Sequence, residues 1–418
     1  MFVTIVNIGD ELLIGQTINT NAAYIGKKLA GIGFIPNVNI IIPDDETSIL
    51  GTFEKFIPIS DVIIVTGGLG PTHDDITKKC IAKYFNDELT LNDDLYKDLV
   101  SFFEKRNRPL TKTNEEQAYF PNKAIPIKNK KGTAPGIYYK IDGKLFFSVP
   151  GVPFEMRVML DEFILDEIEK HFKPSKVIKM KTLLTAGIPE SFLYEQLGDI
   201  NELLGNSKLA FLPGDFGVKM RITVFENSQD EADNKISEIE QKIRALVGQY
   251  IYGVNDDTIE KIVYRLLSQR DLKIAVAESC TGGLISKLLT DIPGASEVYD
   301  RGVVVYSNSA KIELLGVNEE TIVKYGAVSN EVAIEMAKKI KSISGADIGL
   351  AVTGIMGPGG GTTEKPVGTV HIAICDEKSI ISNKFIFGDE REFNRNRTAL
   401  YALDMLRKHL LGIKDIEL

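Results

Sequence analysis

The sequence predicts an α/β protein in which two α/β domains are joined by a small α+β module. Over residues 1–170, strand-like apolar runs alternate with amphipathic helical segments, which is typical of βαβ units around a mostly parallel sheet. The pattern changes at about residue 173, and a second series of βα units begins near residues 250–257. We therefore expect domains at residues 1–170, 171–252 and 253–418.

The composition is that of an ordinary globular protein. The 418 residues are 44% hydrophobic and 26% charged, and a net charge of -9 disfavours binding to the phosphates of nucleic acids. Three widely separated cysteines, Cys80, Cys280 and Cys375, predict neither a disulfide framework nor a metal site, which favours the reducing cytoplasm. The start lacks the basic segment of a signal peptide, and no apolar run approaches the roughly 18 residues that span a bilayer. We expect a cytoplasmic protein without a membrane partner.

In the first domain, the predicted strands 2–6, 38–42 and 61–65 are followed by polar or glycine-rich segments. The carboxyl ends of parallel strands meet at one edge of a doubly wound sheet, and ligands bind there. The glycine-rich turn after the third strand has backbone N–H groups that can hold an anion, and a second turn after strand 145–147 would bring another backbone close. The candidate phosphate-binding residues of these two turns are Gly67, Gly68, Gly70, Thr72, Pro150 and Gly151.

Carboxylates surround the first of these turns. Asp74 and Asp75 follow it directly, and they would repel a phosphate unless a divalent cation lay between. Hard oxygen ligands suit magnesium or manganese, and acids after the first two strands can reach the same edge. The alternative is that Asp74 or Asp75 only caps the next helix, and we expect His73 to stand at that helix start without a ligand role. The candidate metal ligands are Asp10, Glu11, Asp44, Asp74 and Asp75.

This half of the chain contains the motifs GDELL (9–13) with NTN (19–21), TGGLGPT (66–72) before the two aspartates, and VPGVP (149–153). Together they resemble the molybdopterin-binding-like domain of the competence/damage-inducible protein A (CinA) family. The resemblance implies that the glycine turn binds the phosphate of a pterin or a nucleotide. It also implies a pyrophosphatase that acts on ADP-ribose and depends on magnesium, manganese or cobalt.

The middle of the chain predicts a strand at 177–185, a short helix after Pro189, a hairpin of 208–212 with 218–225, and a charged helix at 229–246. No catalytic residues are evident in this stretch. It resembles the small KH-like connecting domain of the same family. Its acidic surroundings disfavour RNA as a partner.

The strand predicted at 273–277 runs into a turn of small residues, and an amphipathic helix follows. A serine there, Ser279, has its hydroxyl near helical N–H groups that would stabilise an oxyanion. Cys280 competes as nucleophile, but its usual activation needs a protonated histidine and this stretch has none. The neighbouring residues of the turn, which we expect at the oxyanion or the substrate, are Thr281, Gly282 and Gly283.

A serine nucleophile needs a base. His371 and His409 are expected in core and surface roles, whereas Lys311 follows a strand at 302–306 that would lie beside the first one. A lysine can serve as base when burial lowers its pKa. On spacing alone, a solvated helix lysine is the alternative. Tyr306, at the end of the same strand, is a further candidate for substrate contact.

Two more segments offer anion contacts. The loop 349–361 is dense in glycine, and its N–H groups suit an oxyanion or a phosphate, although a flexible loop is the alternative. The last helix begins with several arginines that either pair with a substrate phosphate or form a solvated basic face. The candidates from these segments are Thr353, Gly354, Gly357 and Arg397.

The motifs AESCTGG (277–283), YSN (306–308) before Lys311, GAVS (326–329) and VTGIMGP (352–358) resemble the nicotinamide mononucleotide deamidase domain of the CinA family. The resemblance implies a serine amidohydrolase without a cofactor, with Ser279 as nucleophile and Lys311 as base. Met356 stands where the family usually has alanine, and we expect its side chain to narrow the loop. Family analogy also implies a homodimer.

These observations support two hypotheses. In the first, the protein is a bifunctional pyridine-nucleotide salvage hydrolase whose small-molecule partners are nicotinamide mononucleotide and ADP-ribose. In the alternative, it is a non-catalytic nucleotide- or pterin-binding protein that serves as a partner in competence or recombination. Metal-dependent release of AMP separates the two.

Overall fold

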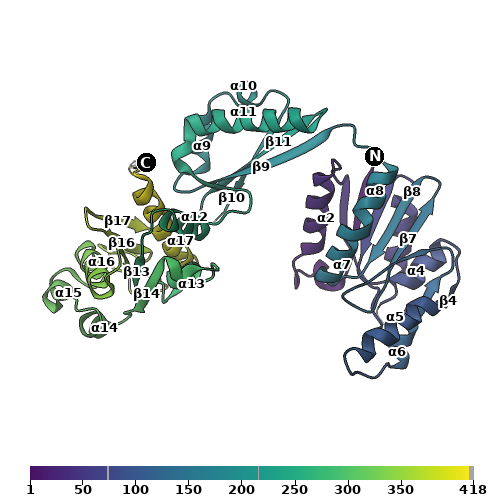
Figure 1. The fold of residues 1–418 in the computed structure, drawn as a ribbon, viewed down its shortest axis with the longest axis horizontal. Coiled ribbons are helices and arrows are strands. Elements are labelled where there is room, and N and C mark those ends of the chain that lie inside the picture. Colours follow the sequence, from purple (N-terminus) through teal and green to yellow (C-terminus); the bar gives the residue numbers. More distant parts are fainter. Residues whose placement is uncertain (73–74, 215, 414–418) are drawn as a thin grey trace. The chain divides into compact units, whose positions relative to one another are not determined.

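A computed structural model describes residues 1–72, 75–214 and 216–413. It confirms the α/β class, with two sheet-containing domains and a small α+β module between them in the sequence (Figure 1). The chain divides into two compact units, Met1–Lys179 with Val224–Asn234 and Met180–Thr223 with Lys235–Leu418. Within the described part of the chain, no helix is both long and apolar enough to cross a membrane.

The N-terminal sheet has the strand order β2-β1-β3-β8-β7-β6. Strands β2, β1, β3 and β8 are parallel, and β7 and β6 add an antiparallel edge. The mostly parallel sheet predicted from the alternation is therefore confirmed. The strands are β1 (Val3–Ile8), β2 (Val38–Ile42), β3 (Val62–Thr66), β6 (Ile125–Ile127), β7 (Gly136–Ile141) and β8 (Lys144–Val149), and a separate pair is β4 (Leu89–Leu91) with β5 (Tyr119–Pro121).

The two faces of this sheet follow the alternation of side chains along each strand. Val3 and Ile5 pack with α2, α7, η2 and α8 on one face, whereas Val6 and Ile8 pack with α3 and α4 on the other. The helices are α1 (Asp10–Leu13), α2 (Thr20–Gly31), α3 (Glu46–Phe56), α4 (Thr77–Tyr84), α5 (Asp93–Glu104), α6 (Lys112–Glu115), η1 (Glu116–Ala118), α7 (Pro153–Met159), the π-helical turn η2 (Leu160–Ile164) and α8 (Leu165–His171).

The middle module contains a sheet of order β10-β11-β9-β12. The predicted hairpin is present as an antiparallel β10–β11 pair, with Lys208 opposite Thr223. Its long helix buries Ile236, Ile239 and Ile243, a spacing of three and four residues that places them on one face. The elements are β9 (Val177–Thr185), α9 (Glu190–Leu197), α10 (Ile200–Leu204), β10 (Lys208–Pro213), β11 (Val218–Glu226), α11 (Gln229–Val247), η3 (Gly248–Tyr250) and β12 (Ile251–Val254).

The C-terminal sheet has the order β14-β13-β15-β16-β17, in which the first three strands are parallel and the last two antiparallel. As predicted, β14 lies beside β13. The strands are β13 (Ile274–Glu278), β14 (Tyr299–Val304), β15 (Ile348–Gly354), β16 (Thr369–Cys375) and β17 (Ile380–Ile386); the helices are α12 (Ile259–Ser268), α13 (Leu284–Thr290), η4 (Ala295–Glu297), α14 (Asn308–Glu313), α15 (Glu319–Tyr325), α16 (Asn330–Ser344) and α17 (Arg391–Leu411).

The size of the side chains differs between the two faces of this sheet. Branched residues such as Val276 and Leu350 pack with α12, α13 and α17, whereas Ala275 and Ala351 face α16. A Cβ on Gly349 would lie 2.1 Å from the carbonyl oxygen of Ala337 in α16. Small residues thus let α16 pack tightly on the sheet, which fixes the strand ends from which the serine and glycine loops begin.

Candidate active sites

Ser279 is the first residue after β13. Its backbone N–H donates to the carbonyl oxygen of Val352 over 3.1 Å, which ties it to the neighbouring strand β15. The residue is 7% exposed. This backbone hydrogen bond continues the pairing of β13 with β15 and therefore holds Ser279 at the carboxyl edge of the sheet.

Lys311 lies in α14, which follows β14 and is capped by Ser307, whose hydroxyl accepts from the Ala310 N–H over 3.0 Å. The lysine Nζ donates to Ser279 Oγ over 2.9 Å and to the carbonyl oxygens of Val305 and Tyr306 over 2.9 and 3.1 Å. Lys311 is 1% exposed, and burial lowers its pKa from the ordinary value of 10.5. The structure brings the predicted nucleophile and base into direct contact and rejects the solvated-lysine alternative.

Cys280 is poorly suited to act as nucleophile. Its side chain is buried in the hydrophobic core of the domain, and burial raises the pKa of the thiol to about 12. A thiol with that pKa holds its proton at neutral pH and is a weak nucleophile. The comparison of neighbouring residues therefore favours Ser279.

Glu278 organises the turn that carries the serine, and the sequence reasoning assigned it no role. Its fully buried carboxylate accepts from the N–H groups of Gly283, Ile285 and Ser286 over 2.8–3.1 Å, and from the Ser286 hydroxyl over 2.6 Å. The expectation that helical N–H groups here serve an oxyanion is wrong, because this carboxylate occupies them. The sequence contained a signal for this role, because an acid shortly before a helix, here Glu278 before the turn at 279–283, is typical of a helix cap.

The substrate role predicted for the side chain of Thr281 is likewise not supported, because its hydroxyl donates to Glu278 over 2.6 Å. The glycines of the turn, Gly282 and Gly283, have φ angles of 60° and 96°. These left-handed conformations let the chain turn back from the strand into α13. Their predicted contact with substrate stays a prediction.

The glycine-rich loop after β15 contributes backbone. The N–H of Ile355 donates to Thr369 on β16, so alternation along the strand directs the N–H of Gly354 to the other side, past the end of β13. That is the side on which Ser279 lies. The Thr353 hydroxyl donates to the carbonyl oxygen of Ala327 and so supports the strand end.

Met356 and Gly357 in this loop pack against other parts of the domain. Met356 does not narrow the loop, because its side chain is buried in the domain core, against the helices that cover the sheet. A Cβ on Gly357 would lie 2.8 Å from the carbonyl oxygen of Asp389, so glycine there permits close contact with the segment before α17. Sequence spacing alone gave no indication of either arrangement.

Arginines at the start of α17 meet these loops. Arg391 donates to the carbonyl oxygen of Gly357 over 3.0 Å and to the Tyr306 hydroxyl over 2.9 Å, and Arg395 donates to the carbonyl oxygen of Thr281 over 3.0 Å. Residues 391 and 395 are four apart and share a helix face. Arg397, the predicted phosphate ligand, instead packs over the Phe393 ring at 4.4 Å. The structure therefore favours Arg391 and Arg395 over Arg397.

The two histidines of this domain have the structural roles expected of them. Burial and nearby lysines lower the pKa of His371 to about 4, which keeps it neutral within β16. His409 contacts Asp376 with 2.9 Å between Nε2 and the carboxylate. Neither histidine forms a hydrogen bond with Ser279 in the described part of the chain.

In the N-terminal domain, the structure brings the two predicted turns together. Gly67 has a φ of 107°, a Cβ on it would lie 2.2 Å from the carbonyl oxygen of Ile8, and one on Gly151 would lie 3.4 Å from Gly67 Cα. Asn21 donates to the carbonyl oxygen of Gly151 over 2.7 Å. The Asn21 Oδ1 and the Thr77 hydroxyl are buried and have no partner among the described residues, so polar groups remain to be satisfied at this edge.

The predicted metal ligands gather only in part. Asp44 accepts from the Asp10 N–H over 3.0 Å, and its pKa is raised first by burial and then by the charges of Glu11, Asp10 and Asp75. Asp75 accepts from the N–H of Thr72 over 2.9 Å and so holds the preceding turn. The N-cap position of α4 is Ile76 and no side chain caps the helix, so the structure does not support the capping alternative for Asp75. His73 and Asp74 lie outside the described residues.

A cation fits the chemistry of this cluster, because the acidic side chains repel one another and supply hard oxygen atoms. Among the described residues, no three His, Cys, Asp or Glu side chains are close enough together to hold a metal ion. Any metal site here thus needs Asp74, the bound phosphate itself, or water as further ligands.

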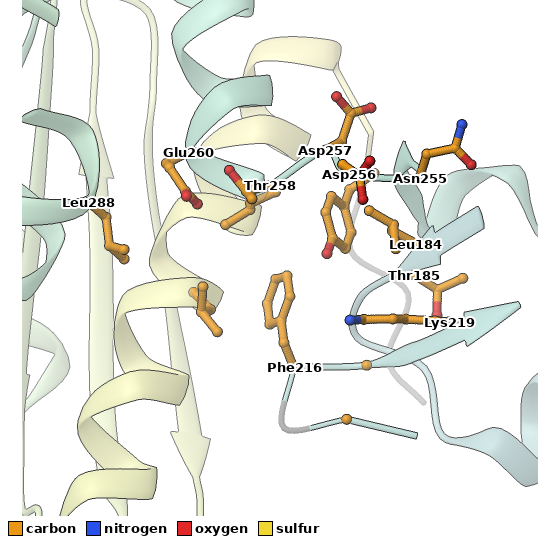
Figure 2. A pocket seen from close by; sticks show the side chains of 15 residues that line it. Leu184, Thr185, Phe216, Lys219, Asn255, Asp256, Asp257, Thr258, Glu260 and Leu288 are labelled. Atoms are coloured by element: carbon orange, nitrogen blue, oxygen red, sulfur yellow. The ribbon is translucent and has the colours of Figure 1, made fainter. Parts of the chain in front are cut away.

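A separate cavity of about 540 Å³ lies within the second unit (Figure 2). Phe216 and Lys219 line it from the middle module, and Thr258, Glu260 and Leu288 line it from the C-terminal domain. None of the predicted site residues lines this cavity. Asp256 and Asp257 also lie on its wall, and Lys219 is the one basic residue among the described residues that line it, so the acids outnumber the bases and the cavity is a poor site for the phosphate of a nucleotide.

Three protein-family profiles match successive segments of this chain. The profile described as "Probable molybdopterin binding domain" matches residues 4–170, "Damage-inducible protein CinA KH domain" matches 180–253, and "CinA C-terminal domain" matches 256–410.

Relatives match over nearly the whole length. A protein of Caldicellulosiruptor saccharolyticus described as competence-damage inducible is 40% identical, over 99% of this chain and 100% of its own. A CinA-like protein of Kosmotoga olearia is 40% identical, over 98% and 99%. A crystal structure of a competence/damage inducible protein from Agrobacterium tumefaciens is 44% identical over 37% of this chain and 95% of its own, with a TM-score of 0.35. The chain belongs to the CinA family of competence-damage inducible proteins.

Proposed function

We propose that the C-terminal domain hydrolyses the carboxamide of nicotinamide mononucleotide, giving nicotinic acid mononucleotide and ammonia. The observation that carries this proposal is the 2.9 Å contact between the buried Lys311 Nζ and Ser279 Oγ. Burial lowers the pKa of Lys311, which favours the neutral amine, and no carboxylate of the described residues forms an ion pair with it. Such an amine beside a serine hydroxyl is the arrangement of a Ser/Lys amidohydrolase.

The positions of the hydrogen-bond partners explain how Lys311 acts as base. A neutral amine has two N–H groups and one lone pair. The carbonyl oxygens of Val305 and Tyr306 accept the two N–H groups, so the lone pair is left for the Ser279 hydroxyl. The lysine takes the serine proton as Oγ attacks the amide carbon, and the ammonium then protonates the leaving nitrogen to release ammonia.

The second half of the reaction uses the same two residues. Lys311, neutral again, takes a proton from water, whose oxygen attacks the acyl carbon; Ser279 leaves with the proton that the lysine returns. In both halves the carbonyl oxygen becomes an oxyanion, for which we propose the Gly354 N–H as a donor. Arg391 and Arg395 are proposed to hold the 5′-phosphate, since each guanidinium has N–H groups left after its contact with a loop carbonyl.

We further propose that the N-terminal domain hydrolyses ADP-ribose to AMP and ribose phosphate. The glycine turns at 67–70 and 150–151 would hold the pyrophosphate, with the unpartnered Asn21 and Thr77 groups as polar contacts. A divalent metal, when bound by acids drawn from Asp10, Glu11, Asp44, Asp74 and Asp75, would neutralise the charge of the pyrophosphate and activate water. These carboxylates would supply the negative charge and the oxygen atoms that bind the metal.

The first experiment incubates the full chain with nicotinamide mononucleotide and measures ammonia, with Ser279→Ala as the control protein. Release by the wild type alone supports the deamidase. The second supplies ADP-ribose with and without magnesium, manganese or cobalt and measures AMP. Tight binding without turnover in both assays would instead indicate the binding-protein hypothesis.

A further inference from the structure

A cavity of about 360 Å³ lies in the N-terminal domain beside the glycine turn. Gly70, Thr72 and Asp75 of the turn segment form one side of it, and the start of α4, the turn η1 and strand β5 form the rest. Its volume falls within the range of about 300–1,000 Å³ typical of small-molecule sites. The chemistry proposed above uses only the turn side, so the opposite wall remains to be explained.

Lys78, in the first turn of α4, brings an ammonium to this wall, and the nearby charge of Glu116 favours its protonated form. Its Nζ donates to the carbonyl oxygen of Glu116 over 2.8 Å, and no carboxylate of the described residues forms an ion pair with it. Burial lowers its pKa to about 8. A half-buried ammonium with N–H groups to spare is stabilised by a phosphate placed in the same cavity.

Gln117, from η1, is a second group on this wall whose hydrogen bonds are unmade. The residue is 3% exposed, and both its Nε2 and its Oε1 lack partners among the described residues. An amide buried in that state is destabilising unless a ligand supplies the missing hydrogen bonds. A side-chain amide offers a donor beside an acceptor, which matches the amino group and ring nitrogen on one edge of adenine.

Tyr119 completes the wall with an aromatic ring. It is 45% exposed, and Leu89, at the start of the paired strand β4, also lines the cavity. Exposed aromatic rings on a strand are platforms on which nucleobases stack. The cavity thus combines a cation, an amide and a ring beside the turn expected to hold a pyrophosphate.

We propose that this cavity is the subsite for the adenosine 5′-phosphate half of the substrate, with the phosphate at Lys78, the base on Tyr119 and its polar edge toward Gln117. This assignment rests on the proposed ADP-ribose hydrolysis for placing the scissile pyrophosphate at the glycine turn. The other half of the substrate, the ribose phosphate, would then lie on the far side of the turn.

The test is calorimetric titration of the full chain with AMP, GMP and adenosine in the presence of magnesium. Lys78→Ala should weaken AMP about tenfold and leave adenosine unchanged, because it removes only the phosphate contact. Tyr119→Ala should weaken AMP and adenosine alike. Gln117→Met, which keeps the size but removes the amide, should abolish the preference for AMP over GMP.

The matched control is Lys83→Ala, in the same helix but paired with Glu46 outside the cavity. It should bind AMP as the wild type does. Hydrogen exchange in the strands β1 and β3 of the same domain reports whether each variant is folded. If the half-buried Lys78 proves necessary for folding, the exposed Tyr119 decides the question.

The subsite is overturned if the wild type binds no AMP at millimolar concentration, or if Lys78→Ala and Tyr119→Ala both bind AMP normally. Failure of the proposed activity gives a different pattern. In that case ADP-ribose is not hydrolysed, but AMP still binds and the Lys78 and Tyr119 variants still weaken it.

Discussion

The two candidate sites differ in how complete they are without a ligand. In the C-terminal domain, Lys311 bonds to Ser279, and Glu278 accepts from the Thr281 hydroxyl and from backbone N–H groups of the turn, so the reactive pair is already assembled. In the N-terminal domain, Asn21 and Thr77 have polar atoms without a partner among the described residues, and the acids near Asp44 repel one another. The comparison indicates a preorganised covalent catalyst in one domain and a site completed by metal and substrate in the other.

The most severe way to break the first site is to remove one member of its reactive pair. Ser279→Ala is expected to lower ammonia release from nicotinamide mononucleotide by at least about 10³-fold, and Lys311→Ala by nearly as much, because members of one catalytic unit do not add. AMP release from ADP-ribose should be unchanged. Cys280→Ala is the matched control and should retain substantial turnover; a dead Cys280→Ala beside an active Ser279→Ala would make the domain a thiol enzyme.

Glu278 tests whether preorganisation depends on the buried cap. Glu278→Gln replaces one acceptor oxygen with an amino group that faces backbone N–H donors, so the C-terminal unit should lose about 3 kcal/mol of stability. Hydrogen exchange at residues 283–286 should accelerate, and kcat should fall because the serine turn loosens. Glu313→Gln, on the exposed face of α14, should change neither. Unchanged exchange in the Glu278 variant would show that the carboxylate does not hold the turn.

The second site should respond to charge rather than to shape. Asp75→Asn keeps an oxygen that can accept from the Thr72 N–H, so the turn is preserved while one negative charge is lost. We expect AMP release to fall about 10–100-fold and the metal concentration for half-activity to rise, with deamidation unchanged. Asp74→Asn should behave similarly. If activity and metal requirement both stay as in the wild type, the two aspartates are not metal ligands.

The arginines of α17 sharpen the view of the serine site. Arg391→Ala and Arg395→Ala should each raise KM for nicotinamide mononucleotide about tenfold, since a charge-assisted contact to phosphate contributes about 1.5–3 kcal/mol. Arg397→Ala, in the same helix but over Phe393, should leave KM within about twofold. Equal effects of all three substitutions would mean that the helix carries a diffuse basic face rather than a phosphate site.

The parts of this protein that were predictable from sequence are those fixed by the position of strand ends. Ser279 and Lys311 each follow a parallel strand of one sheet, so their meeting follows from topology. The same reasoning placed Gly67 beside Gly151 at the edge of the N-terminal sheet. Local periodicity was enough for these contacts.

The errors have a different origin. The sequence indicated Arg397 or a neighbouring arginine for the phosphate and did not separate them, because the face of a helix depends on where the helix begins, and that boundary was not fixed. The oxyanion role of the helical N–H groups failed because Glu278 was not considered as their competitor, although it lies in the same motif. The Met356 side chain was expected in the loop because the sequence around it does not show that the side chain turns into the core.

The pH dependence of kcat for deamidation is expected to show the smallest effect among the tests of this comparison. Burial lowers the pKa of Lys311, and only the neutral amine can act as base, so kcat should rise with pH, by at most tenfold per unit, toward an alkaline plateau. The N-terminal reaction has no lysine base and should not follow the same curve.

Stability should move in the same direction for the same reason. Between the lowered pKa of Lys311 and its ordinary value of 10.5, the unfolded chain binds more protons than the folded one, so the free energy of unfolding rises with pH in that window. Lys311→Met keeps the buried volume and removes the titrating group. The difference between wild type and Lys311→Met in urea unfolding should therefore grow in favour of the wild type as pH increases. A difference that is constant with pH would show that this lysine is not held neutral by burial, and the base assignment would fail with it.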